Sequence, residues 1–196
     1  MKILKYVLYF IVGFVVLFLA VGLIKPSVSY GHEIKVNKPV EEAWAVSQDE
    51  SKYSQWLEGF KSMELISGEK FEAGSKYKVV VNPGEGQPDF EMTETIVSIK
   101  EFDHVTMTFD SDFMDFEQTI NFSEADGTTT VKSDSKVIGK NIFTRSMFAL
   151  MEMFTGAFQK QEAKNFEALK KLIEENTTDY YPAPSEAAEE EALSTE

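Results

Sequence analysis

The sequence predicts an α+β domain in which a curved antiparallel sheet wraps round a long carboxyl-terminal helix, preceded by one transmembrane helix. Three observations support this prediction: an unbroken apolar run near the amino terminus, a series of alternating segments separated by turn residues, and a 3.6-residue apolar period towards the carboxyl end. One further strand and two short helical segments precede the series. The order of these segments decides the fold class.

The apolar run covers residues 6–24 and contains no charged side chain. At 1.5 Å per residue it spans about 28 Å, close to the roughly 30 Å hydrocarbon core of a bilayer. We therefore expect residues 1–30 to form an anchor that crosses the membrane once. The alternative is a cleaved signal peptide, with Lys2 and Lys5 as its basic region and a small-residue triplet at 20–22, but such peptides have shorter apolar cores of roughly 7 to 15 residues.

Basic residues flank the run almost equally, so the positive-inside rule only weakly orients it. Lys2 and Lys5 precede the run, and Lys25, Lys35 and Lys38 follow it. The very short leading segment resembles a signal-anchor and favours a soluble domain outside the cytoplasm. We expect a single-pass membrane protein with this orientation.

Composition limits the remaining possibilities. Residues 31–175 are long enough for one domain with its own core. The chain has no cysteine, which excludes disulfides, a thiolate nucleophile and cysteine-ligated metals. Its formal charge of −14 argues against nucleic acid as a partner, because neutralising phosphates requires a basic surface, and it disfavours a domain lying flat on anionic lipids. Residues 176–196 lack lysine and arginine and predict a disordered acidic tail.

The domain begins with a strand that runs directly into a short helix. Residues 32–37 alternate between apolar and polar side chains, and Val40, Ala43 and Trp44 then recur at helical spacing. A second short helical segment covers about 52–57. A strand followed by two short helices is therefore expected before the main sheet.

Six alternating segments follow, and turn residues separate them. The Asp126-Gly127 pair is a strong two-residue hairpin signal. The pattern predicts an antiparallel meander with strands at 63–66, 77–81, 90–99, 105–109, 114–122 and 129–137.

One helix is predicted from about Phe143 to Glu175, because its apolar residues follow the 3.6-residue period. The stripe consists of Met147, Met151, Phe154, Phe158, Phe166, Leu169 and Ile173. With the preceding strands, this element completes the order of a helix-grip fold.

A family resemblance supports this prediction. The stretch EIKVNKPVEEAWAVSQDESKYSQWLEGF, followed by Gly74-Ser75-Lys76-Tyr77 at the entry to a strand, resembles the START-like, Bet v 1-like (SRPBCC) superfamily, which includes polyketide cyclase and dehydrase-type proteins. The resemblance covers roughly residues 31–173. It implies a hydrophobic cavity between sheet and long helix that in many members holds a lipid, sterol or polyketide. Members include binders and enzymes, so the fold alone does not settle the function.

Strand alternation indicates which polar groups face such a cavity. Gln118, for example, shares its parity with Phe116 and Ile120. A few polar groups in an apolar cavity can orient a ligand, although the same residues can also serve as ordinary core. The candidate ligand-binding residues are Tyr77, Glu94, Gln118, Ser133, Ser135, Met147, Met151, Phe154 and Phe158.

The usual catalytic signatures are missing from the sequence. His104 precedes a strand whose parity turns it outward, and no nucleophile-base pair can be argued. The acidic cluster from Asp110 to Glu117 lacks the glycine and glutamate of an EF-hand loop, so we expect neither a metal nor a cofactor. Glu94 is the one weak catalytic candidate, as a general base whose pKa burial would raise.

The leading hypothesis is a membrane-anchored START-like domain that binds a hydrophobic small molecule or lipid and performs no chemistry. A polyketide cyclase- or dehydratase-like enzyme that uses the carboxylate of Glu94 is the first alternative. A protein-interaction module at the membrane is the second.

Overall fold

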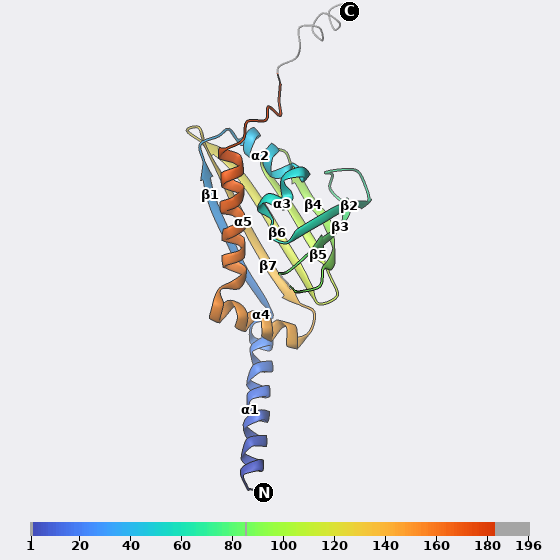
Figure 1. Ribbon diagram of the computed structural model, residues 1–196, viewed down its shortest axis with the longest axis vertical. Helices are drawn as coiled ribbons and strands as arrows, with labels where there is room; N and C mark the ends of the chain where they lie inside the picture. Colours follow the sequence, from blue (N-terminus) through green and yellow to red (C-terminus); the bar gives the residue numbers. More distant parts are fainter. Residues whose placement is uncertain (1, 85, 183–196) are drawn as a thin grey trace, which may run out of the picture.

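The computed structural model describes residues 2–84 and 86–182. Helix α1 extends away from a domain in which a curved sheet faces a helix (Figure 1). The fold class predicted from the sequence is confirmed. The elements in chain order are α1 (Lys2–Ile24), β1 (Ser27–Val36), α2 (Val40–Gln48), η1 (Glu50–Lys52), α3 (Tyr53–Trp56), β2 (Phe60–Ser67), β3 (Lys76–Val81), β4 (Phe90–Lys100), β5 (His104–Asp110), β6 (Met114–Ala125), β7 (Thr128–Gly139), α4 (Ile142–Thr155) and α5 (Ala157–Glu174).

The seven strands form one antiparallel sheet in the order β1-β7-β6-β5-β4-β3-β2. Consecutive strands from β2 to β7 are neighbours, as expected for a meander, and β1 pairs with β7. Strand β1 begins at Ser27, within the stretch that the sequence assigns to the anchor, because Ser27 continues the pairing with β7 as far as Ile138. Register shifts mark irregularities in β2 and β4, of the kind that bends a strand.

Helix α5 packs against the inner face of the sheet together with α2 and α3 (Figure 1). Phe166, Leu169 and Ile173 of α5 are almost fully buried. Trp44 of α2 lies edge-on to Phe122 of β6, with ring centroids 5.1 Å apart. This core fills one end of the space between sheet and helix and leaves the rest to a cavity.

The single helix predicted for 143–175 is wrong, because two helices meet at Gly156. Gly156 has a left-handed backbone with φ of 61°, which glycine adopts without the steric cost of a side chain. The Glu152 carboxylate also accepts a 2.8 Å hydrogen bond from the backbone N–H of Phe158. As a result, α4 crosses the end of the sheet next to α1, and only α5 runs along the inner face (Figure 1).

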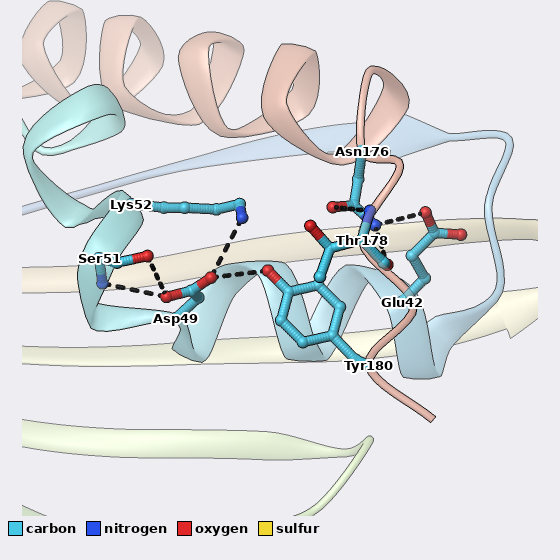
Figure 2. Close-up of polar contacts among 7 residues, drawn as sticks. All are labelled: Glu42, Asp49, Ser51, Lys52, Asn176, Thr178 and Tyr180. Atoms are coloured by element: carbon cyan, nitrogen blue, oxygen red, sulfur yellow. Dashed lines mark hydrogen bonds and ion pairs between the residues drawn. The ribbon is translucent and has the colours of Figure 1, made fainter. Parts of the chain in front are cut away.

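The start of the predicted disordered tail, residues 176–182, instead lies against α2 and η1 (Figure 2). The side-chain amide of Asn176 donates to Glu42 over 2.9 Å, and the Tyr180 hydroxyl donates to Asp49 over 2.7 Å. Hydrogen bonds and partial burial thus hold this segment, although its composition alone predicts disorder. Residues 183–196 lie outside the described part of the chain.

Candidate functional site

A cavity of about 300 Å³ lies between the inner face of the sheet, α3 and α5. Its wall is mainly apolar, as is usual for small-molecule sites. The apolar lining includes Met63, Val79, Met92, Val105, Met107, Phe109, Met114, Phe116, Ile120, Val137, Phe158 and Phe166.

Glu94 of β4 contributes a carboxyl group to this lining. The residue is 6% exposed, and its burial among apolar side chains raises its pKa to about 7. Desolvation favours the uncharged acid, which can donate a hydrogen bond as well as accept one. Near neutral pH, Glu94 is therefore present in both protonation states.

Glu162 of α5 is the second buried acid in the lining, also 6% exposed. Its Oε1 accepts hydrogen bonds from the side-chain amide of Gln118 at 3.0 Å and from the hydroxyl of Ser135 at 2.8 Å. The Gln118 amide also lies 3.1 Å from the Ser135 hydroxyl. This network joins the neighbouring strands β6 and β7 to α5 and fixes the carboxyl group of Glu162 at the cavity wall.

Two aromatic residues add polar atoms to the wall. Tyr30 of β1 stacks on Phe158, with centroids 5.4 Å apart, and burial followed by the charge of Glu162 raises the pKa of its hydroxyl, which keeps it neutral. Trp56 is 6% exposed, and its indole N–H has no hydrogen-bond partner within the described residues. A buried donor without a partner costs on the order of 1 to 3 kcal/mol.

Among the described residues, the cavity lining has acidic side chains but no basic ones. Its carboxyl groups are those of Glu58, Glu94 and Glu162, and no lysine, arginine or histidine of the described chain lines the cavity. The exposed lining residues, Glu58 and Gln161, lie where the end of α3 meets α5. There the Asn165 side-chain oxygen accepts from the backbone N–H of Glu58 at 3.2 Å and from the amide of Gln161 at 3.0 Å. We take this junction as the cavity mouth.

Of the candidates named from the sequence, Glu94, Gln118 and Phe158 line the cavity. Ser135 stands behind the lining and positions Glu162. Tyr77 is buried beyond the cavity, where its hydroxyl accepts a 2.8 Å hydrogen bond from the backbone N–H of Phe71. The hydroxyl of Ser133 is likewise occupied, because it accepts from the backbone N–H of His32 at 3.0 Å.

The three candidates on the first half of the predicted long helix lie away from the cavity lining. Met147 is 40% exposed and Phe154 is 76% exposed on α4. Met151 does not line the cavity, but it packs against a core cluster that contains Phe148 and shares Val137 with the lining. The chain turns at Gly156, and this turn removes α4 from the inner face of the sheet. His104 does not line the cavity either, and its ring forms hydrogen bonds with Ser98 and Asp103.

Sequence reasoning missed Glu162, Tyr30 and Trp56 as lining residues. Glu162 had a detectable signal, because it is spaced four residues from both Phe158 and Phe166 and thus shares their helical face. Tyr30 falls in the stretch assigned to the anchor. Trp56 was interpreted as a packing residue, and it does pack edge-on to Phe166 with centroids 6.3 Å apart while it also lines the cavity.

Structural comparison supports the fold. The chain is similar to the crystal structure of Ara h 8.0201 (15% identity, 76% of this chain and 99% of that chain, TM-score 0.58). It is also similar to a conserved protein from Geobacillus kaustophilus (20% identity, 74% and 95%, TM-score 0.59). A third similar structure is a Thalictrum flavum norcoclaurine synthase point mutant in complex with a transition-state analogue (18% identity, 78% and 97%, TM-score 0.54).

Sequence comparison identifies the family. No curated protein matches the chain. Residues 27–174 match the family described as polyketide cyclase / dehydrase and lipid transport. The match covers the sheet, the cavity lining and all of α5. The chain therefore belongs to the polyketide cyclase / dehydrase and lipid transport family, within the SRPBCC, Bet v 1-like proteins.

Proposed function

We propose that this protein is a membrane-anchored binder of an apolar small molecule that carries a hydrogen-bond donor or a positive charge. The observation behind the proposal is an apolar cavity whose buried ionisable lining consists of acids and tyrosines. Family membership supports a hydrophobic ligand. Glu94, Gln118, Glu162 and Tyr30 are the proposed polar contacts.

The size of the cavity limits the ligand. Small-molecule pockets have volumes of roughly 300 to 1,000 Å³, so a cavity of about 300 Å³ is at the lower end of the range. It suits a compact aromatic or short aliphatic molecule better than a lipid with two long acyl chains.

The charge of the lining limits the ligand further. Two like charges about 4 Å apart repel by about 4 kcal/mol at an effective dielectric constant of about 20. An anionic head group beside an ionised Glu94 or Glu162 meets such a repulsion, since the lining has no cationic side chain within the described residues. An amine or alcohol head group instead finds carboxyl acceptors.

Helix α1 is the proposed anchor, and it is long and apolar enough to cross a membrane. The alternative of a cleaved signal sequence is disfavoured by the contacts that α1 makes with the folded domain. The backbone N–H of Gly22 donates to the hydroxyl of Ser146 over 3.1 Å, and Phe18 packs on Phe143. These contacts support residues 1–30 as a retained anchor, with 31–175 as the main body of the domain outside the cytoplasm.

The test uses the full chain in phosphatidylcholine nanodiscs and three probes with the same aromatic body: naphthylethylamine, naphthylethanol and naphthylacetic acid. We expect the amine and the alcohol to bind at least about tenfold more tightly than the acid at pH 7, which corresponds to about 1.4 kcal/mol. Empty nanodiscs correct for partition into lipid. Glu162→Gln should weaken binding. Equal or tighter binding of the acid would contradict the proposed ligand class, and no binding of any probe would contradict the binding function.

A second candidate function is proton abstraction by Glu94, favoured by its pKa of about 7 in an apolar cavity. A β-keto ester is a suitable probe, because removal of its α-proton gives an enolate and transfers that proton to the carboxylate. Exchange of the α-proton in D₂O, followed by NMR, should then be faster with the protein and should lose that acceleration with Glu94→Gln. Exchange that is no faster than in buffer would exclude this role.

A further inference from the structure

Helix α4 exposes a row of large apolar side chains. Phe143 is 58% exposed, Met147 40% and Phe154 76%, and the half-buried Leu150 completes their spacing of four, three and four residues. Residues at this spacing share one face of a helix. A continuous exposed apolar face on a folded domain marks an interaction surface.

The position of α4 beside α1 indicates what covers this face. The rings of Phe18 in α1 and Phe143 in α4 lie 5.3 Å apart, and the backbone N–H of Gly22 bonds to Ser146. The two helices approach so closely that a Cβ on Gly22 would lie 2.5 Å from the backbone oxygen of Ile142. Figure 1 shows α4 running across the domain end of α1.

The contacts between α1 and α4 also determine how far α4 lies inside the end of the apolar run. They involve Phe18 and Gly22, which lie six and two residues before the end of the apolar run at Ile24. At 1.5 Å per residue, α4 therefore lies about 3 to 9 Å inside that end. Helices that lie in a membrane surface bury their apolar faces by about 5 to 10 Å, which is the same depth.

We propose that α4 lies in the surface of the membrane that α1 crosses, with Phe143, Met147, Leu150 and Phe154 in the lipid. The proposal rests on the proposed anchoring by α1. Helix α4 carries one cation, Arg145, and one anion, Glu152, so its attraction is to the apolar part of a neutral bilayer and does not require anionic lipid. A spanning helix and a surface helix joined in this way hold the sheet and cavity at one orientation above the membrane.

The absence of cysteine makes single-site labelling straightforward. We would introduce Met147→Cys and Phe154→Cys separately in the full chain, with Glu174→Cys, exposed near the far end of α5, as the matched control. Each variant receives a nitroxide label and is incorporated into phosphatidylcholine vesicles. Collision with oxygen, which dissolves in lipid, is compared with collision with a water-soluble nickel chelate.

Labels at positions 147 and 154 should collide more with oxygen than with nickel, and the label at position 174 should show the opposite preference. Greater nickel access at 147 and 154 in vesicle-integrated protein would overturn the placement of α4. So would strong spin–spin broadening between labels of two molecules, since a second copy would then cover this face. Loss of the protein from vesicles on alkaline washing would instead contradict the anchoring by α1. A failure of the anchor can therefore be distinguished from a failure of the placement of α4.

Discussion

The side-chain amide of Gln118 donates a 3.0 Å hydrogen bond to the carboxyl group of Glu162 and thereby joins the centre of the sheet to α5. The two residues are 44 positions apart in the chain. Both line the cavity, so the same bond that fastens the helix to the sheet also defines the polar part of the proposed binding site.

Replacing Gln118 with leucine should destabilise the protein by about 1 to 3 kcal/mol, because the buried carboxyl group of Glu162 loses one of its two donors. Chemical denaturation of the full chain in detergent measures the change. The same substitution is also made in a Glu162→Leu background. There Gln118→Leu should lower the free energy of unfolding by clearly less than it does in the wild type. An equal cost in both backgrounds would show that the bond contributes nothing.

Glu94 should make stability fall as pH rises. Its pKa is raised from 4.5 to about 7 in the folded protein, so the folded state holds its proton more tightly than the unfolded state does. Stability therefore declines between about pH 4.5 and 7, by an amount on the order of 3 kcal/mol.

Glu94→Gln removes the ionisation and should stabilise the protein at pH 8 but not at pH 4. Unfolding at several pH values in one detergent tests this expectation. Glu64→Gln, an exposed position on β2, is the matched control and should leave the pH profile unchanged. A wild-type profile that is flat between pH 4.5 and 7 would contradict the raised pKa.

The two halves of the predicted long helix should respond differently to truncation. Leu169 of α5 is fully buried, so Leu169→Ala should cost about 2 to 5 kcal/mol of unfolding free energy. Phe154 of α4 is 76% exposed, and Phe154→Ala should change the stability in detergent by less than about 1 kcal/mol. Comparable losses at both sites would contradict the placement of α4.

The segment after α5 should contribute measurably through Tyr180. Burial alone would raise the pKa of Asp49, but hydrogen bonds from Ser51, Tyr180 and Lys52 outweigh it and lower that pKa well below its usual range (Figure 2). Tyr180→Phe should cost about 0.5 to 1.5 kcal/mol at pH 7. The loss should shrink as acid protonates Asp49, since the stabilising contribution of a lowered pKa disappears at low pH. Tyr181→Phe, at a half-exposed ring, should have no such effect.

Period-two alternation was enough to assign the inner face of the sheet. It placed Glu94 and Gln118 on the side of the sheet that lines the cavity, because successive side chains of a strand point to opposite faces. Alternation does not show where along a strand the cavity ends. Tyr77 shares a face with Val79, yet only Val79 lines the cavity, since the Tyr77 hydroxyl is already bonded to the Phe71 backbone.

The sequence by itself determined the apolar helix, the order of strands and the grip of a sheet on a carboxyl-terminal helix, because these features follow from local periodicity. Only the tertiary structure decided that Gly156 ends α4, because a glycine in the sequence can continue a helix or adopt the left-handed conformation that ends one. The same turn placed Glu162 against Gln118 and Ser135 and left Phe154 on the exposed face of α4. Contacts between distant residues, which no local pattern records, thus define the cavity and its acidic lining.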